Sequence, residues 1–107
     1  MALEVYQFTK TFPENEKYGL TSQMRRASIS VASNIAEGKG RSSDKDFVAF
    51  LCRARGSLLE LETPILLSRR FEYLTQTQES MLMSATSQVG KILNGLINSL
   101  RETNRAA

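Results

Sequence analysis

Residues 18–62 read YGLTSQMRRASISVASNIAEGKGRSSDKDFVAFLCRARGSLLELE, and this stretch decides the fold. It holds two helical patterns of apolar residues, joined by the short linker GKGRSS at residues 38–43. Because glycine and serine interrupt helices, the linker predicts a tight turn between two helices. No segment of the chain shows the alternation of apolar and polar residues that is typical of strands, so the sequence predicts an all-α protein.

The first helix of this stretch is predicted over residues 19–37. Its main apolar stripe consists of Leu20, Met24, Ala27, Val31 and Ile35. A second stripe lies beside it and consists of the smaller set Ile29, Ala32 and Ala36. Two stripes on one helix indicate two partners, the core of the bundle and something outside it. Gly38 and Gly40 are expected to end the helix, since glycine readily adopts the positive φ of a C-terminal cap.

Apolar spacing predicts three further helices over residues 2–12, 43–70 and 75–102. Pro13 ends the first of them, because the residue before a proline avoids helical geometry. Ser43 begins the third with a capping pattern, and Thr75 or Thr77 caps the last. Pro64 is expected to kink the third helix, the alternative being two separate helices that meet there. The prediction is therefore one domain over residues 1–107, an antiparallel up-down four-helix bundle with a short first helix, assembling into a ring-like oligomer.

The composition excludes several classes of function. The chain of 107 residues has no histidine, which removes Ser-His and Cys-His nucleophiles and histidine metal ligands. Cys52 is the single cysteine, so we expect no disulfide and no zinc site. We expect Cys52 to be a small apolar side chain in the core; the alternative is that it is a reactive thiol. We expect no catalytic residues, no metal and no cofactor, and therefore no enzyme.

The sequence also carries expectations about location. The N-terminus has neither the basic region nor the apolar core of a signal peptide. No apolar run approaches the roughly 18 residues of a membrane span. We therefore expect a cytoplasmic protein that does not enter a membrane.

Positive charge gathers in one stretch. Between Met24 and Arg55 there are seven Lys or Arg and three Asp or Glu, and the net charge of the whole chain is +3. Arginine suits phosphate because its planar fork donates two hydrogen bonds at once. The linker at the start of a helix offers glycines, cations and hydroxyls, although it is not a Walker A motif. The candidates for nucleic-acid binding are Arg25, Lys39, Arg41, Lys45, Arg53 and Arg55; ordinary solvated charges or ion pairs are the alternative.

Polar residues lie close to the apolar stripes of the second helix. Asn34 and Glu37 are three residues apart and share a face, and Gln23 lies on the same helix. One carboxylate beside an amide does not make an acid–base pair, so a hydrogen-bond network that fixes helix register or a subunit interface is the better interpretation.

Three segments carry a family resemblance: FPENEKYGLTSQMRRA at residues 12–27, SNIAEGKGR at residues 33–41 and ARGSLLELE at residues 54–62. They resemble the bacterial family of 23S rRNA-intervening-sequence proteins, which are four-helix bundles. A related accessory protein of diversity-generating retroelements forms a basic, barrel-shaped homopentamer that engages a reverse transcriptase and nucleic acid. The resemblance implies a homopentamer, with RNA or DNA and a reverse transcriptase or other nucleic-acid-processing protein as partners.

In such an oligomer Gly56 and Ser57 would allow close helix contact, since a glycine inside a helix costs about 1 kcal/mol relative to alanine and needs a packing reason. The leading hypothesis is a non-enzymatic oligomer that associates with the RNA or DNA backbone through a basic face. The alternative is a homo-oligomeric scaffold for a nucleic-acid enzyme or ribosomal component. The candidate structural and interface residues are Gln23, Arg26, Ile29, Ala32, Asn34, Ala36, Glu37, Gly56 and Ser57.

Overall fold

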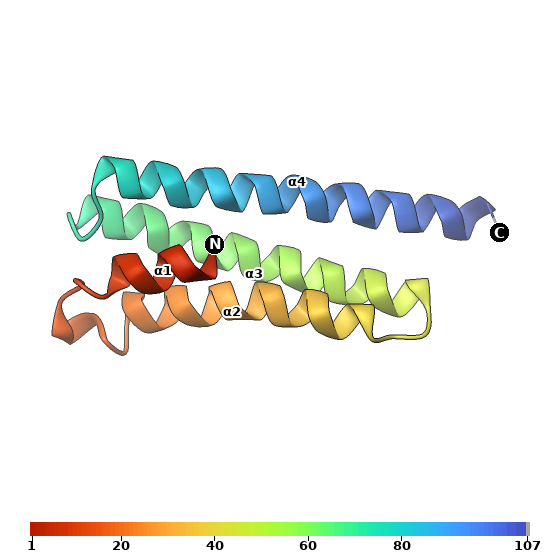
Figure 1. The fold of residues 1–107 in the computed structure, drawn as a ribbon, viewed down its shortest axis with the longest axis horizontal. Coiled ribbons are helices and arrows are strands. Elements are labelled where there is room, and N and C mark those ends of the chain that lie inside the picture. Colours follow the sequence, from red (N-terminus) through yellow and green to blue (C-terminus); the bar gives the residue numbers. More distant parts are fainter. Residues whose placement is uncertain (107) are drawn as a thin grey trace.

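The computed structural model describes residues 1–106, and within them all regular structure is helical. In Figure 1 each α-helix runs antiparallel to the one before it. The structure therefore agrees with the predicted all-α, up-down arrangement over this range. In chain order the elements are α1 (Ala2–Thr9), the 3₁₀ turn η1 (Glu14–Glu16), α2 (Leu20–Lys39), α3 (Asp44–Arg70) and α4 (Gln76–Ala106).

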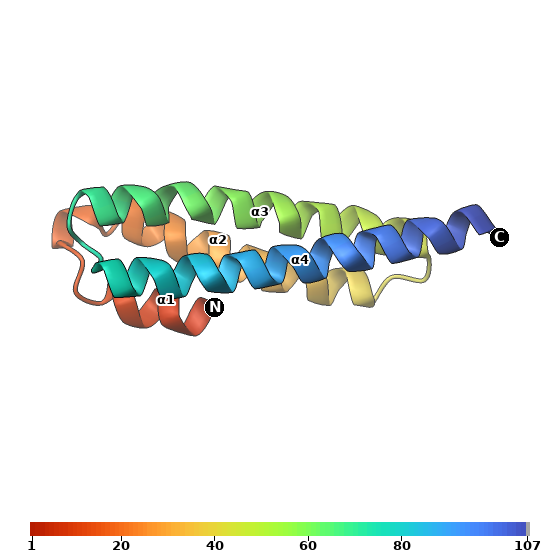
Figure 2. The same cartoon turned by 90° about the horizontal axis from the view of Figure 1, so that it is seen from above.

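The helices pack as a closed ring in which α1 contacts α2 and α4, and α3 contacts the same two helices from the other side. Figure 2 shows α1 and α3 on opposite sides of α4. The molecule is elongated, with extents of 52 × 22 × 17 Å. Since α1 has only 8 residues, it accompanies the other three helices along part of their length, and the N-terminus lies near the middle of the bundle (Figure 1).

The core divides along the length of the molecule because α1 is short. One cluster of buried side chains draws on all four helices and includes Val5, Met24, Ile65 and Leu82. The other is built from α2, α3 and α4 alone, and it consists of Val31, Leu51, Ala54, Leu58, Leu93 and Ile97. The predicted apolar stripe of α2 supplies residues to both clusters.

The first helix ends earlier than predicted. α1 stops at Thr9, where the sequence predicted a helix to residue 12. After Thr9 the chain forms a tighter turn, in which the N–H of Phe12 donates a hydrogen bond to the carbonyl of Thr9, three residues back. Phe12 still reaches the core, with its ring 5.4 Å from that of Tyr73. The proline that follows then opens η1.

The second helix ends two residues later than predicted: Gly40 is its C-terminal cap, as expected, but the expectation for Gly38 is wrong. Gly38 lies inside α2, which continues to Lys39, and neither Gly38 nor Gly40 has a positive φ. A Cβ atom on Gly38 would lie 2.9 Å from Phe50 Cβ and from Phe47 Cδ1. The glycine is therefore required by the close approach of α3, and the helix passes through it.

The start of α3 is confirmed. Ser43 Oγ accepts a hydrogen bond of 3.1 Å from the backbone N–H of Asp46. α3 is one continuous helix from Asp44 to Arg70 with Pro64 inside it, so the alternative of two separate helices is wrong.

Of the two threonines that the sequence offered as the cap of α4, the structure shows Thr75 in that role. The Thr75 hydroxyl accepts from the N–H of Gln78, and the Gln78 side chain accepts from the N–H of Thr75. This reciprocal pair is a capping box. α4 then runs to Ala106, four residues beyond the prediction, because no glycine or proline follows Gly95 to end it. In the part of the chain that the structure describes, no helix is both long and apolar enough to cross a membrane.

Candidate functional site

Two candidate cations meet at one aromatic ring beside the turn between α2 and α3. The guanidinium of Arg41 lies 4.7 Å from the centroid of the Phe50 ring, and that of Arg53 lies 4.6 Å from it. The two Cζ atoms are therefore at most 9.3 Å apart, the sum of those distances. Phe50 itself is buried, 9% exposed, because it also packs on Gly38. A fixed ring thus holds two arginine forks close together, which stabilises their positions through cation–π attraction.

Arg41 forms an ion pair with Glu37. Its Nη2 donates to Glu37 Oε1 at 3.0 Å, and both side chains are about half exposed. An exposed ion pair of this kind contributes little to stability. Lys39 and Lys45 lie on either side of this turn and are exposed, and Asp44 and Asp46 occupy the first turn of α3.

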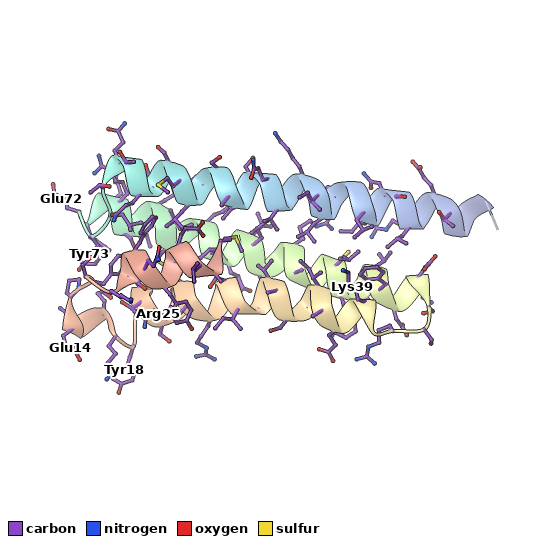
Figure 3. The ribbon with its side chains drawn as sticks, in the orientation of Figure 1. Glu14, Tyr18, Arg25, Lys39, Glu72 and Tyr73 are labelled. Atoms are coloured by element: carbon purple, nitrogen blue, oxygen red, sulfur yellow. The ribbon has the colours of Figure 1, made fainter. Side chains whose placement is uncertain are left out.

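The other two cationic candidates are placed elsewhere and hold helices together. Arg25 donates from Nε to Thr9 Oγ1 at 2.9 Å and lies 4.6 Å from the centre of the Tyr6 ring, so it fastens α1 to α2. Arg55 donates to Asn94 Oδ1 at 3.0 Å and so joins α3 to α4. Figure 3 shows the separation clearly, with Arg25 and Lys39 at different levels of α2. The six cations do not form one face; four of them gather at the α2–α3 turn.

A groove of about 550 Å³ lies between α2 and α3. Pro64 lies in its wall and carries no N–H, so the carbonyl of Glu60 lacks the usual helical donor four residues ahead. We call this the α2–α3 groove. Its lining includes Gln23, Arg26 and Ser30 from α2, and Glu60, Pro64 and Leu67 from α3.

Two of the predicted interface residues, Gln23 and Arg26, line this groove, and Ser30 in its wall connects it to a third, Asn34. Ser30 and Ser57 share a hydrogen bond of 2.8 Å between their hydroxyls, and Asn34 donates to the Ser30 carbonyl at 2.9 Å. Asn34 therefore belongs to a hydrogen-bond network that links α2 to α3 within one chain, while Glu37, which was expected to share it, pairs with Arg41 instead. Arg26 and Glu60, on opposite walls, are both exposed.

The second stripe of α2 contributes nothing to the core. Ile29, Ala32 and Ala36 are all exposed, and Ile29 is 46% exposed. Gly56 is exposed as well, and a Cβ atom there would meet nothing within 4 Å. Among the described residues, therefore, Gly56 makes no close helix contact. On the outward side of α3 near the groove, Leu59, Leu66, Leu67 and Phe71 are between 42% and 61% exposed.

Two titratable groups outside the groove have shifted pKa values. The pKa of Tyr73 is raised, first by desolvation and then by its hydrogen bond to Glu16, which is part of the 3₁₀ turn. The pKa of Glu4 is lowered by the N-terminal ammonium group. Cys52 is a free, half-buried thiol that packs against the second core cluster, 3.8 Å from nitrogens of Arg55 and Arg101. No group of three His, Cys, Asp or Glu side chains that could hold a metal is present among the described residues.

The sequence had missed the shared ring of Phe50. A partial signal existed, since Phe50 and Arg53 are three residues apart on one helix and so share a face. The approach of Arg41 from the preceding turn depends on how α2 and α3 pack, which no local pattern reports.

Comparisons with known proteins agree with this fold. No curated protein matches the chain. A crystal structure of a protein of unknown function from Bacteroides thetaiotaomicron, described as a member of the S23 ribosomal protein family, is 26% identical and has a TM-score of 0.79. The similarity covers 90% of this chain and 87% of that one. The family described as 23S rRNA-intervening sequence protein matches residues 1–95. The chain therefore belongs to the 23S rRNA-intervening sequence protein family.

Proposed function

We propose that this protein is non-enzymatic and associates with the phosphate backbone of RNA or DNA through the α2–α3 turn. The observation that carries the proposal is the pair of guanidinium groups on the Phe50 ring, within 4.7 Å of its centre. Two arginine forks at most 9.3 Å apart are suited to neighbouring phosphate groups, each of which accepts two parallel hydrogen bonds. Lys39 and Lys45 add exposed charge beside them.

The contacts are to the backbone and carry no base recognition. Phe50 is only 9% exposed, so it offers little free surface on which a base could stack. Three acidic residues at the same turn limit the local excess of positive charge, and Glu37 competes directly for Arg41. The expected behaviour is modest affinity with little preference for sequence.

Binding to a labelled RNA hairpin and a labelled DNA duplex tests the proposal by fluorescence anisotropy. Four neutralised phosphates predict a loss of about 100-fold in affinity between roughly 50 and 200 mM salt. The double variant Arg41→Gln, Arg53→Gln should weaken binding to both ligands. The charge-matched control is Lys10→Gln combined with Lys91→Gln, which removes two exposed cations outside the α2–α3 turn. Equal binding by the arginine variant and this control would refute the assigned site.

A second candidate function is a homo-oligomeric scaffold, and the α2–α3 groove supports it. An exposed arginine and an exposed glutamate face one groove, and exposed leucines and Phe71 continue from it along α3. Contiguous apolar surface of this kind is typical of interaction sites. We propose that a second copy covers this side, in the ring of five that the family resemblance implies, and that the assembly presents its basic turns to a nucleic-acid-processing partner.

Sedimentation equilibrium tests the scaffold. Leu67→Glu places a charge at the groove, where the leucine is 42% exposed, and should reduce the mass of the assembly. Ile92→Glu on α4 is the control for an added charge on another surface, since Ile92 is 68% exposed. A monomeric wild-type protein at micromolar concentration would overturn this second candidate and leave the phosphate proposal standing.

A further inference from the structure

A second pair of arginines lies on the α4 side of α3. Arg55 Nη2 and Arg101 Nη2 are each 3.8 Å from Cys52 Sγ, so the two nitrogens are at most 7.6 Å apart, the sum of those distances. Figure 1 shows the last turns of α4, to which Arg101 belongs, at the end of the bundle where the α2–α3 turn lies. We call Arg55 and Arg101 the α4-side pair, and we call Arg41 and Arg53 the turn pair.

The α4-side pair has spare capacity to bind an anion. Arg55 donates one N–H to Asn94 Oδ1 at 3.0 Å, but the thiol that the remaining N–H groups approach is only a weak acceptor. Over residues 1–103, the range in which side chains are described, neither arginine of this pair forms an ion pair. Two like charges held so close repel each other, so an oxyanion bound between them would lower the electrostatic energy of the folded protein.

The surface of α3 between the two pairs carries no large side chain. Arg53 and Arg55 are two residues apart, about 200° around the helix, so their side chains leave α3 on opposite flanks. By helical spacing, Ala49 and Gly56 lie between these flanks on the side away from the core, and both are exposed. A Cβ atom on Gly56 would meet nothing within 4 Å, so no neighbouring side chain covers this position. We call the surface at Ala49 and Gly56 the bare surface of α3.

We propose that one strand of an RNA or DNA backbone crosses the bare surface of α3, with phosphates bound to the turn pair on one flank and to the α4-side pair on the other. The inference rests on the function proposed above and adds Arg55 and Arg101 to its binding residues. A helix with its side chains is about 10–12 Å wide, which three or four phosphate steps of a stacked strand cover at roughly 3.4 Å each. Gly56 would allow the strand to lie against the helix, because glycine permits close approach to a ligand.

The salt dependence of binding to a labelled DNA duplex counts the phosphate contacts. The double variant Arg55→Gln, Arg101→Gln removes two of them, so its slope of log affinity against log salt should be about 1.8 shallower than that of wild type. Between roughly 50 and 200 mM salt, this variant should keep the loss of about 100-fold that the turn alone predicts. Wild type should lose more than about 1000-fold over the same range.

Two controls separate charge from packing. Lys10→Gln combined with Lys91→Gln removes the same net charge outside both arginine pairs and should leave the slope within about 0.5 of wild type. Asn94→Ala removes the hydrogen bond between Arg55 and α4 but no charge. It should therefore lower the melting temperature, measured by circular dichroism, and keep the slope of wild type.

Gly56→Gln tests the bare surface without a change of charge. A side chain there would stand between the strand and α3, so affinity at low salt should fall about fivefold or more, although glutamine is the better helix former. Gly95→Gln on α4 is the matched control, because an added Cβ there also meets nothing within 4 Å. This control should change affinity by less than about twofold.

The outcomes distinguish this inference from the function on which it rests. Equal slopes for wild type and the variant of the α4-side pair would overturn the crossing and leave the turn pair as the whole site. Equal affinities of the two glycine variants would overturn the path over the bare surface. No binding of the duplex by wild type at roughly 50 mM salt would refute the proposed function, and this inference with it.

Discussion

Gly38 and Phe50 are in such close contact that a single added carbon would not fit between them: a Cβ atom on the glycine would lie 2.9 Å from Phe50 Cβ. Phe50 Cβ is fixed to the backbone of α3, so the strain cannot be relieved by rotating a side chain. The contact sets the distance between α2 and α3 at the end of the bundle where the cationic cluster lies. The position of the basic turn therefore depends on the absence of a side chain at residue 38.

Gly38→Ala should destabilise the protein, although alanine is the better helix former. Overpacking a close contact costs about 1–3 kcal/mol, against a gain in helix propensity of about 1 kcal/mol. Urea unfolding at fixed protein concentration measures the difference. The control is Gly95→Ala in α4, where an added Cβ meets nothing within 4 Å. Gly95→Ala should stabilise by up to about 1 kcal/mol, so changes of the same sign at both sites would contradict this account.

Thr75→Ala should cost about 1 kcal/mol, because it removes the hydroxyl that caps α4. Thr77 lies one residue into the same helix and is exposed. Thr77→Ala should change stability by less than about 0.5 kcal/mol. Thermal unfolding of the two variants distinguishes them. Equal losses would mean that the capping box seen at Thr75 and Gln78 does not stabilise the helix.

Arg25→Ala should loosen α1 from the rest of the bundle. The change removes a hydrogen bond to Thr9 and a cation–π contact with Tyr6, together about 1–3 kcal/mol. Hydrogen exchange of the α1 amides should accelerate about tenfold or more, while the amides of α3 keep their protection. Arg26→Ala is the adjacent control, since Arg26 lines the α2–α3 groove. Unchanged exchange in α1 of the Arg25 variant would show that apolar packing alone holds this helix.

Tyr73→Phe should alter stability in a manner that depends on alkaline pH. The pKa of Tyr73 is raised above 10.0 in the folded protein, so folding favours the protonated hydroxyl. This contribution is present in full below pH 10 and is lost as the pH rises through the folded pKa. Wild type should therefore lose stability relative to the Phe variant above pH 10. A stability difference that stays constant from pH 8 to pH 11 would be inconsistent with the shift.

Apolar periodicity predicted the existence of every main helix, because each α-helix buries one stripe of side chains. Ser43 and Thr75 were found from sequence for a similar reason, since capping depends on residues only three apart. The ends of α2 and α4 were missed for different reasons. Gly38 is required by α3, which is distant in the chain, and the last turns of α4 continue because nothing interrupts them.

The candidate site was predictable only in part. The exposed stripe of Ile29, Ala32 and Ala36 followed from helical geometry, and the structure leaves it outside the core. Charge density located the basic turn. The sorting of cations into those that hold helices together and those that remain at the turn depended on tertiary contacts. Arg25 and Arg55 have the same chemistry as Arg41 and Arg53, and only their neighbours distinguish them.

The division of the core into two clusters has a consequence for how the protein opens. Where three helices enclose the second cluster, fewer buried contacts oppose local unfolding than where four enclose the first. Cooperative opening should therefore begin at the end that carries the α2–α3 turn and spread towards the η1 end. A polyanion bound at that turn would hold the weaker end closed, so the free energy of binding would appear as slower proteolysis and a melting temperature that rises with the logarithm of ligand concentration above the Kd.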